Sequence, residues 1–169
     1  MSENRNGNGK PLLPITFDSV RDKNVEQLRV LNNVIFPIRY QEKFYKDCLA
    51  CQDVNQFALY NDVSVGAIGS RLEKQPDGTA KLHIMTLGVL APYRGMGVGS
   101  RLLQRVLDFC KQDPNIVEVF LHVQVNNQEA VDFYTKFGFS NTGTAKDYYK
   151  KLDPPNAWIL SKDLRVLDG

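Results

Sequence analysis

The sequence predicts an α/β (α+β) fold, with a mixed, mostly antiparallel central sheet of about seven strands and about four helices. Three observations predict it. Residues 56–90 contain three extended runs separated by turn residues. A glycine-rich turn, LAPYRGMGVGSRLL at 90–103, follows the last run and leads into an amphipathic segment. The chain has 169 residues, 43% of them hydrophobic, enough for one domain with a substantial core and too few for two of ordinary size.

The first third of the chain predicts a tail, a strand and two helices. Residues 1–14 are rich in Asn and Gly and end at a proline, so we expect a disordered tail, followed by a single domain over residues 15–165. ITFDSV at 15–20 predicts a short strand. Apolar residues recur at helical spacing over 23–35, just before Pro37, and predict the first helix. EKFYKDCLAC at 42–51 predicts a second, shorter one.

The middle of the chain changes to extended patterns. QFALY at 56–60, VSVGAIGSRL at 63–72 and KLHIMTLGVL at 81–90 are separated by Asn61-Asp62 and by QPDG at 75–78. These separators have the composition of tight turns. We therefore expect three successive antiparallel strands.

After the glycine turn, the pattern predicts a helix with an apolar face, then a strand, a helix and two strands. VEVFLHVQV at 117–125 suits a central strand. Asn126 and Glu129 resemble a capping box at the start of the next helix, and Gly138 is its expected end. The final strands are expected near 139–146 and 157–162. The apolar faces of the two helices comprise Leu102, Leu103, Val106, Leu107 and Cys110 in the first, and Ala130, Phe133, Tyr134 and Phe137 in the second.

Charge and cysteine content narrow the function classes. The chain has 21 basic and 19 acidic side chains, with a net charge of +2 and no block of one sign, which argues against sequence-specific nucleic-acid binding. Its polar opening and the absence of a long apolar run predict neither signal peptide nor membrane helix. Three cysteines, an odd number, fit a reducing compartment, and the C-x-x-C of Cys48 and Cys51 lacks a second ligand pair, so we expect plain thiols and no metal. We expect a soluble protein of the cytoplasm, with the nucleus as a second location.

The glycine turn indicates phosphate binding by backbone. The Lys-Ser or Lys-Thr of a P-loop is missing, and the dinucleotide fingerprint fails because Ser100 and Leu102 stand where it needs glycine. What remains is Arg94-x-x-Gly97-x-Gly99 at the start of a helix, whose free N–H groups and positive dipole end can hold a pyrophosphate. A glycine-rich helix start without a ligand is the alternative.

With the turn placed after the fourth strand, the sequence resembles the Gcn5-related N-acetyltransferases (GNAT), whose acetyl-coenzyme A signature is R-x-x-G-x-G and whose order of strands and helices is the same. Further segments are similar to the NatE-type N-α-acetyltransferase catalytic subunits. The likeness runs from about residue 15 to 165. The segments are FPIRY (36–40), IMTLGVLAPYRG (84–95), LHVQ (121–124), N-x-x-A-x-x-FY-x-KFGF (127–139) and DYYKKL (147–152).

This resemblance implies transfer of acetyl from acetyl-CoA to the α-amine of protein N-termini, preferentially those with Met followed by an apolar residue. The amine attacks directly, with a general base acting through water. The implied catalytic residues are His122, His83 and Tyr134, the last as a proton donor to the leaving thiolate. His83 departs from the family pattern, because a tyrosine usually precedes IMTLG. By residue type alone, a histidine such as His122 more often has a structural role than a catalytic one. Tyr134 fits core packing and catalysis equally well.

The resemblance also implies binding residues. For acetyl-CoA these are Leu87, Gly88, Val89, Arg94, Gly95, Met96, Gly97, Val98, Gly99, Ser100, Asn127 and Tyr134. For the peptide they are Phe36, Pro37, Ile38, Tyr40, Arg71, Met85, Tyr148, Tyr149 and Leu152, although such aromatic residues are ordinarily core.

Two alternatives stay open at this point. One is an acetyltransferase for lysine or a small amine. The other is a weakly active subunit that acts mainly as a binding component of a ribosomal N-terminal acetyltransferase complex, which the departure at His83 favours. The resemblance implies a helical-repeat auxiliary subunit and a NatA-type catalytic subunit as partners at the ribosome.

Overall fold

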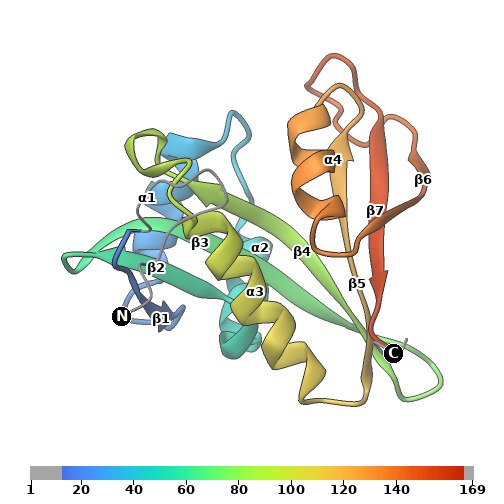
Figure 1. Ribbon diagram of the computed structural model, residues 1–169, viewed down its shortest axis with the longest axis horizontal. Coiled ribbons are helices and arrows are strands. Elements are labelled where there is room, and N and C mark those ends of the chain that lie inside the picture. The colour runs from blue at the N-terminus through green and yellow to red at the C-terminus, as the bar shows by residue number, and fades with distance from the viewer. Residues whose placement is uncertain (1–12, 166–169) are drawn as a thin grey trace. The chain divides into compact units, whose positions relative to one another are not determined.

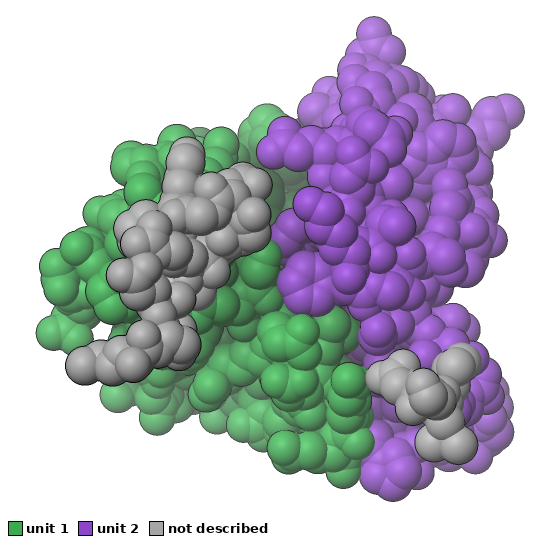
Figure 2. Space-filling view, in the orientation of Figure 1, with its two compact units in different colours: residues 1–71, 86–112 green, residues 72–85, 113–169 purple. Residues whose placement is uncertain are grey.

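A computed structural model describes residues 13–165 of the chain (Figure 1). The described residues form two compact units (Figure 2): the first contains 13–71 and 86–112, the second 72–85 and 113–165. Most of the tail expected at 1–14 lies outside the described residues. At its end, the Leu13 carbonyl accepts a hydrogen bond of 2.9 Å from Nη1 of Arg101.

The strands form one mixed sheet in the order β1-β2-β3-β4-β5-β7-β6. The β4 and β5 strands pair in parallel, and the pairs β1/β2, β2/β3, β5/β7 and β6/β7 are antiparallel. The predicted fold class, with seven strands and four α-helices among the described residues, is confirmed. The elements are β1 (Thr16–Ser19), α1 (Val25–Ile35), α2 (Glu42–Ala50), β2 (Gln56–Tyr60), β3 (Val63–Lys74), β4 (Ala80–Val89), α3 (Val98–Lys111), β5 (Ile116–Gln124), α4 (Gln128–Thr135), β6 (Ser140–Ala145) and β7 (Ala157–Asp163), with short 3₁₀ turns at Gln52–Val54 and Ala91–Tyr93.

In the first unit, helices cover both faces of the sheet. A Cβ added to Gly66 would lie 3.3 Å from Val98 of α3, and one added to Gly69 would lie 2.9 Å from Phe44 of α2. Because these two glycines are three residues apart on β3, they face opposite sides. Therefore α3 packs on one face and α2 on the other, and the predicted apolar face of α3 is buried, including Leu102, Leu103, Val106, Leu107 and Cys110.

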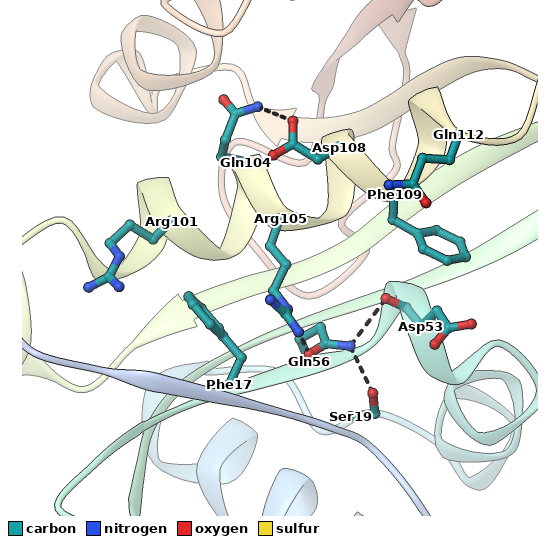
Figure 3. Close-up of a pocket in the computed structure, with 10 residues that line it drawn as sticks. All are labelled: Phe17, Ser19, Asp53, Gln56, Arg101, Gln104, Arg105, Asp108, Phe109 and Gln112. Atoms are coloured by element: carbon teal, nitrogen blue, oxygen red, sulfur yellow. Dashed lines mark hydrogen bonds between the residues drawn. The ribbon is translucent and has the colours of Figure 1, made fainter.

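A pocket of about 480 Å³, lined mostly by polar side chains, lies between the other side of α3 and β1 (Figure 3). The guanidinium of Arg105 lies 4.8 Å from the ring centre of Phe17, and its Nε donates a 3.2 Å hydrogen bond to Oε1 of Gln56. The Gln56 amide donates in turn to Ser19 and to the Asp53 carbonyl. The polar groups beneath α3 thus bind one another and hold β1 to the helix.

In the second unit, β5 alternates between a buried and a half-buried face. Val119, Leu121 and Val123 form the buried face, whereas Phe120 and His122 lie on the other. The central strand predicted at 117–125 is confirmed, because β5 lies between β4 and β7 in the sheet.

Helix α4 begins one residue later than the predicted capping box. Oδ1 of Asn127, not of Asn126, accepts a 3.2 Å hydrogen bond from the Ala130 amide, so the expected cap was placed one position too early. The helix ends at Thr135, three residues before the expected end at Gly138, which lies in the turn that follows with φ of +91°. Of the predicted apolar face only Tyr134 is buried, and Phe133 is half-buried.

Within the described residues the three cysteines form no disulfide bond. Cys48 is buried in α2, and burial raises its pKa to about 12. A thiol with so high a pKa is a poor nucleophile at neutral pH. Separately, no helix within residues 13–165 is long and apolar enough to cross a membrane.

Candidate functional site

The glycine turn precedes α3 and leaves the start of the helix open. Gly95 and Gly97 have φ of +76° and +81°, and Gly97 is the N-cap residue. No side chain in the described structure caps this end, and the first amide bonded back into the helix is that of Arg101, which donates to the Gly97 carbonyl at 3.1 Å. The amides of Val98–Ser100 therefore have no partner within the helix and can bind an anion, helped by the helix dipole.

Packing alone does not explain every glycine here. A Cβ on Gly99 would meet only Val89, at an ordinary 3.7 Å, so the protein itself has room for a side chain. By contrast, a Cβ on Gly88 would lie 2.7 Å from the Phe36 ring, so packing against the end of α1 requires that glycine. The bare surface at Gly99 fits a group that approaches the backbone closely, such as a pyrophosphate.

Arg94 is held in place by the strand before the turn. Its Nε donates a 2.9 Å hydrogen bond to the Val89 carbonyl, and Leu90 donates through its amide to the Val65 carbonyl at 2.8 Å. A guanidinium anchored through Nε keeps its two terminal nitrogens for an anion. The predicted phosphate turn thus has both donors and a fixed positive charge.

The second unit contains a cluster of rings around two histidines. His83 of β4 is paired in register with Phe120 of β5, and their rings stack at 4.5 Å. The His83 and His122 rings are 5.3 Å apart at 63°. Tyr148 stacks on His122 at 4.0 Å, and Tyr149 meets Tyr148 edge-on at 4.9 Å. Four of the predicted site residues, His83, His122, Tyr148 and Tyr149, are therefore in one cluster.

His122 is suited to accept a proton at neutral pH. Burial lowers its pKa below the ordinary value of 6.5, and the nearby Glu73 carboxylate opposes part of that shift. The imidazole is therefore neutral near pH 7 and keeps a free lone pair. The Tyr149 hydroxyl donates a 3.2 Å hydrogen bond to the His122 carbonyl, which ties the loop after β6 to the strand.

Glu73 is a site residue that the sequence reasoning missed. Its Oε1 lies 3.5 Å from Nδ1 of His83, whose side chain is only 8% exposed, whereas the Glu73 side chain is 35% exposed. The signal available in the sequence was the short β3–β4 hairpin through QPDG, which brings the end of β3 back beside the start of β4.

Three other predicted residues have structural contacts of their own. Tyr134 is buried between Phe133 and Phe139, and burial raises its pKa, so its hydroxyl stays protonated. Asn127 caps α4. Arg71 forms an ion pair with Asp47 of α2 at 3.6 Å. Met85 follows His83 by two residues on β4 and so shares its face.

Apart from Arg71 and Met85, which lie on β3 and β4, the residues predicted to hold the peptide come from a loop in each unit. In the first unit, Phe36 meets Tyr40 edge-on at 6.0 Å, with Pro37 and Ile38 between them in the loop after α1. In the second, Tyr148 is 43% exposed, and the Leu152 amide donates to the Tyr149 carbonyl at 3.2 Å. Each loop thus presents aromatic rings held by local contacts.

Comparison with known proteins gives one consistent family. Residues 19–139 match the Acetyltransferase (GNAT) family. N-alpha-acetyltransferase 50 of Danio rerio is 44% identical over 151 residues, covering 89% of each chain, and the probable N-acetyltransferase san of Drosophila melanogaster is 42% identical, covering 89% of this chain and 82% of that one.

Solved structures agree. Arabidopsis thaliana Naa50 in complex with the bisubstrate analogue CoA-Ac-MVNAL superposes with a TM-score of 0.84 at 49% identity, covering 89% of this chain and 99% of that one. The same order of elements, the open glycine turn before α3 and these likenesses lead to one conclusion: the chain belongs to the GNAT acetyltransferase family and, within it, to the N-α-acetyltransferases of the NatE type.

Proposed function

We propose that this chain transfers acetyl from acetyl-CoA to the α-amine of protein N-termini that begin with Met followed by an apolar residue. The observation that carries the proposal is the likeness to Naa50 bound to CoA-Ac-MVNAL, an analogue that joins coenzyme A to a peptide starting Met-Val. At 49% identity over 89% of this chain, the likeness covers both units.

The donor is held by the glycine turn. The free amides of Val98–Ser100 and the guanidinium of Arg94 bind the pyrophosphate of acetyl-CoA, with Gly95, Met96 and Gly97 shaping the turn. The backbone of Leu87–Val89 pairs with the pantetheine arm. Asn127 and Tyr134 are the proposed contacts near the sulfur, and Tyr134 has the protonated hydroxyl that a proton donor needs.

Proton removal is assigned to the histidine cluster. An α-amine has a pKa of roughly 7.7 to 8.0, so its neutral form is already present near pH 7 and a moderate base is sufficient. The lowered pKa of His122 keeps its imidazole neutral, and we assign it as the general base acting through water. The neutral amine then attacks the thioester carbon, and the C–S bond breaks as the amide forms.

The first residue of the peptide is held by apolar and aromatic side chains. Burying a full Met side chain stabilises binding by roughly 1.5 to 3 kcal/mol. Tyrosine hydroxyls can bind the peptide backbone. The assigned residues are Phe36, Pro37, Ile38 and Tyr40 of the first unit, Met85, Tyr148, Tyr149 and Leu152 of the second, and Arg71, whose ion pair with Asp47 makes it the least direct of the set.

A peptide assay tests the proposal. Labelled acetyl-CoA is incubated with the protein and with peptides that begin Met-Val, Met-Leu or Ser, together with a Met-Val peptide whose α-amine is blocked and which contains lysine. We expect label on the two free Met peptides only. Transfer to the blocked peptide would favour a lysine acetyltransferase, and tight acetyl-CoA binding without transfer would favour a binding component.

The proposed partners are a helical-repeat auxiliary subunit and a NatA-type catalytic subunit at the ribosome, in the cytoplasm with the nucleus as a second location. One surface of the first unit has suitable character. Val30, Val34 and Val63 are 64%, 69% and 60% exposed and line a groove of about 510 Å³ between α1 and the start of β3. Clustered exposed apolar side chains are typical of protein interaction surfaces. Co-purification with the auxiliary subunit, compared between the native chain and Val34→Asp, tests this assignment.

A further inference from the structure

We infer that Glu73 is a positioning residue that makes His83 a proton acceptor in place of the tyrosine usual at this position. The inference rests on the proposed function, because it names how the same site handles a proton. It is carried by the ion-pair contact between Oε1 of Glu73 and Nδ1 of His83, 3.5 Å apart.

The carboxylate sets the tautomer of the ring. Oε1 of Glu73 lies 3.5 Å from Nδ1 of His83 without the geometry of a hydrogen bond, so the carboxylate acts on the ring through its charge, which favours the hydrogen of a neutral His83 on Nδ1, the nitrogen that faces it. The lone pair is then on Nε2, at the opposite edge of the ring. Stacking on Phe120 at 4.5 Å and 13° keeps the ring plane fixed. His83 is therefore held with its accepting nitrogen directed away from Glu73.

The negative charge also favours the protonated form. His83 is 8% exposed, and burial without a counter-charge would oppose formation of an imidazolium. Glu73 supplies that counter-charge. From β5, His83 also meets the neutral ring of Phe120 and the imidazole of His122, 5.3 Å away. The next row on this face, Lys81 and Glu118, forms its own ion pair at 3.1 Å.

A tyrosine in this place would need no such partner. Its hydroxyl has an ordinary pKa near 10 and passes a proton as a neutral group. A buried histidine takes up a proton only as a cation, so the exchange to His83 needs a carboxylate beside it. In the step proposed, a water molecule passes one proton of the substrate ammonium to His122, the general base, and the proton moves on to Nε2 of His83, 5.3 Å away between ring centres, from which it leaves to solvent water. The amine loses a second proton after the C–N bond forms, and that proton ends on the sulfur as the C–S bond breaks.

The test is a double-mutant cycle of Glu73→Gln and His83→Tyr, with Glu73→Asp as the conservative variant. We expect Glu73→Gln to lower kcat about tenfold with an unchanged KM for acetyl-CoA, and to move the acidic limb of the pH profile to lower pH. Glu73→Asp should restore most of the rate. In the His83→Tyr background, Glu73→Gln should change kcat by less than about twofold. An equal loss in both backgrounds, or an unmoved acidic limb, would overturn the inference.

A second measurement does not depend on activity. Imidazole ¹⁵N NMR of the native protein should show hydrogen on Nδ1 of His83, and Glu73→Gln should lower the pKa of that ring. An unchanged tautomer and pKa in Glu73→Gln would overturn the inference even in an active enzyme. An inactive native protein that shows the expected NMR change would instead overturn the proposed function and leave the Glu73–His83 pairing supported.

Discussion

The glycine turn of the first unit and the ring cluster of the second are built from different parts of the chain. The turn offers unpaired backbone amides at the start of α3, two glycines with positive φ and one anchored arginine. The cluster is made of the side chains of His83, His122, Tyr148 and Tyr149; burial lowers the pKa of His122, and the Glu73 carboxylate opposes part of that shift. A backbone site tolerates side-chain change as long as the loop keeps its path. A side-chain site loses its chemistry when a single reacting group is replaced.

The largest effect is expected in the cluster. His122→Ala removes the proposed base and should lower kcat by about 100-fold or more, with little change in the KM for acetyl-CoA. Steady-state kinetics with a Met-Val peptide measure both values. His122→Asn, which keeps a polar side chain but cannot accept the proton, is the matched control and should be as slow. A native rate in either variant would remove His122 from the mechanism.

Substitutions in the glycine turn should change the KM for acetyl-CoA and leave kcat nearly constant. Arg94→Ala removes the charge anchored on the Val89 carbonyl and should raise the KM for acetyl-CoA about tenfold, equivalent to about 1.4 kcal/mol, at nearly constant kcat. Arg94→Lys restores the positive charge without the planar guanidinium that binds through two N–H groups, so it should recover only part of the affinity. A fall in kcat as large as the fall in affinity would contradict the assignment of acetyl-CoA binding to the turn and of catalysis to the ring cluster.

A smaller effect is expected at Gly99, where one substitution should change protein stability and acetyl-CoA binding in opposite directions. Gly99→Ala fits the protein and favours the helix, so it should raise the free energy of unfolding by about 0.5 to 1 kcal/mol. It should also raise the KM for acetyl-CoA about threefold, equivalent to about 0.7 kcal/mol, because the methyl group meets the phosphate. Denaturant titration and kinetics measure the two quantities.

Gly88→Ala is the control for Gly99→Ala. Its Cβ would lie 2.7 Å from the Phe36 ring, so it should destabilise the protein by about 1 to 3 kcal/mol. Opposite signs of the stability change at the two glycines are expected. A stabilised Gly99→Ala with native KM would show that no ligand approaches there.

The smallest effect concerns pH and stability. The pKa of His122 is lower in the folded protein than the value of about 6.5 expected after unfolding. Below about pH 6.5 the unfolded chain therefore binds more protons than the folded protein, so the free energy of unfolding decreases as the pH falls. Between pH 7 and 5, the Tm of the native protein should fall about 1 °C more than that of His122→Asn. Calorimetry at several pH values measures this, and an equal fall in both would contradict the lowered pKa.

Local patterns predicted most of the fold. The apolar face of α3 and the central strand β5 each depend on neighbours in the sequence, and both are confirmed. The capping box was misplaced by one residue because Asn126 and Asn127 are adjacent and chemically the same. The predicted roles of the site residues stay predictions. The structure adds that Asn127 caps α4, and it confirms the core placement that the helical pattern predicts for Tyr134.

The sequence alone determined the order of elements, the family and the phosphate turn, because glycine spacing and hydrophobic period are local properties of the chain. Only the tertiary structure decided what surrounds the histidines. The contact of Glu73 with His83 depends on the path of the β3–β4 hairpin, and the stacking of Tyr148 on His122 depends on a loop 26 residues further along the chain. Burial and the position of one carboxylate set the protonation of a histidine, and both are properties of the folded chain.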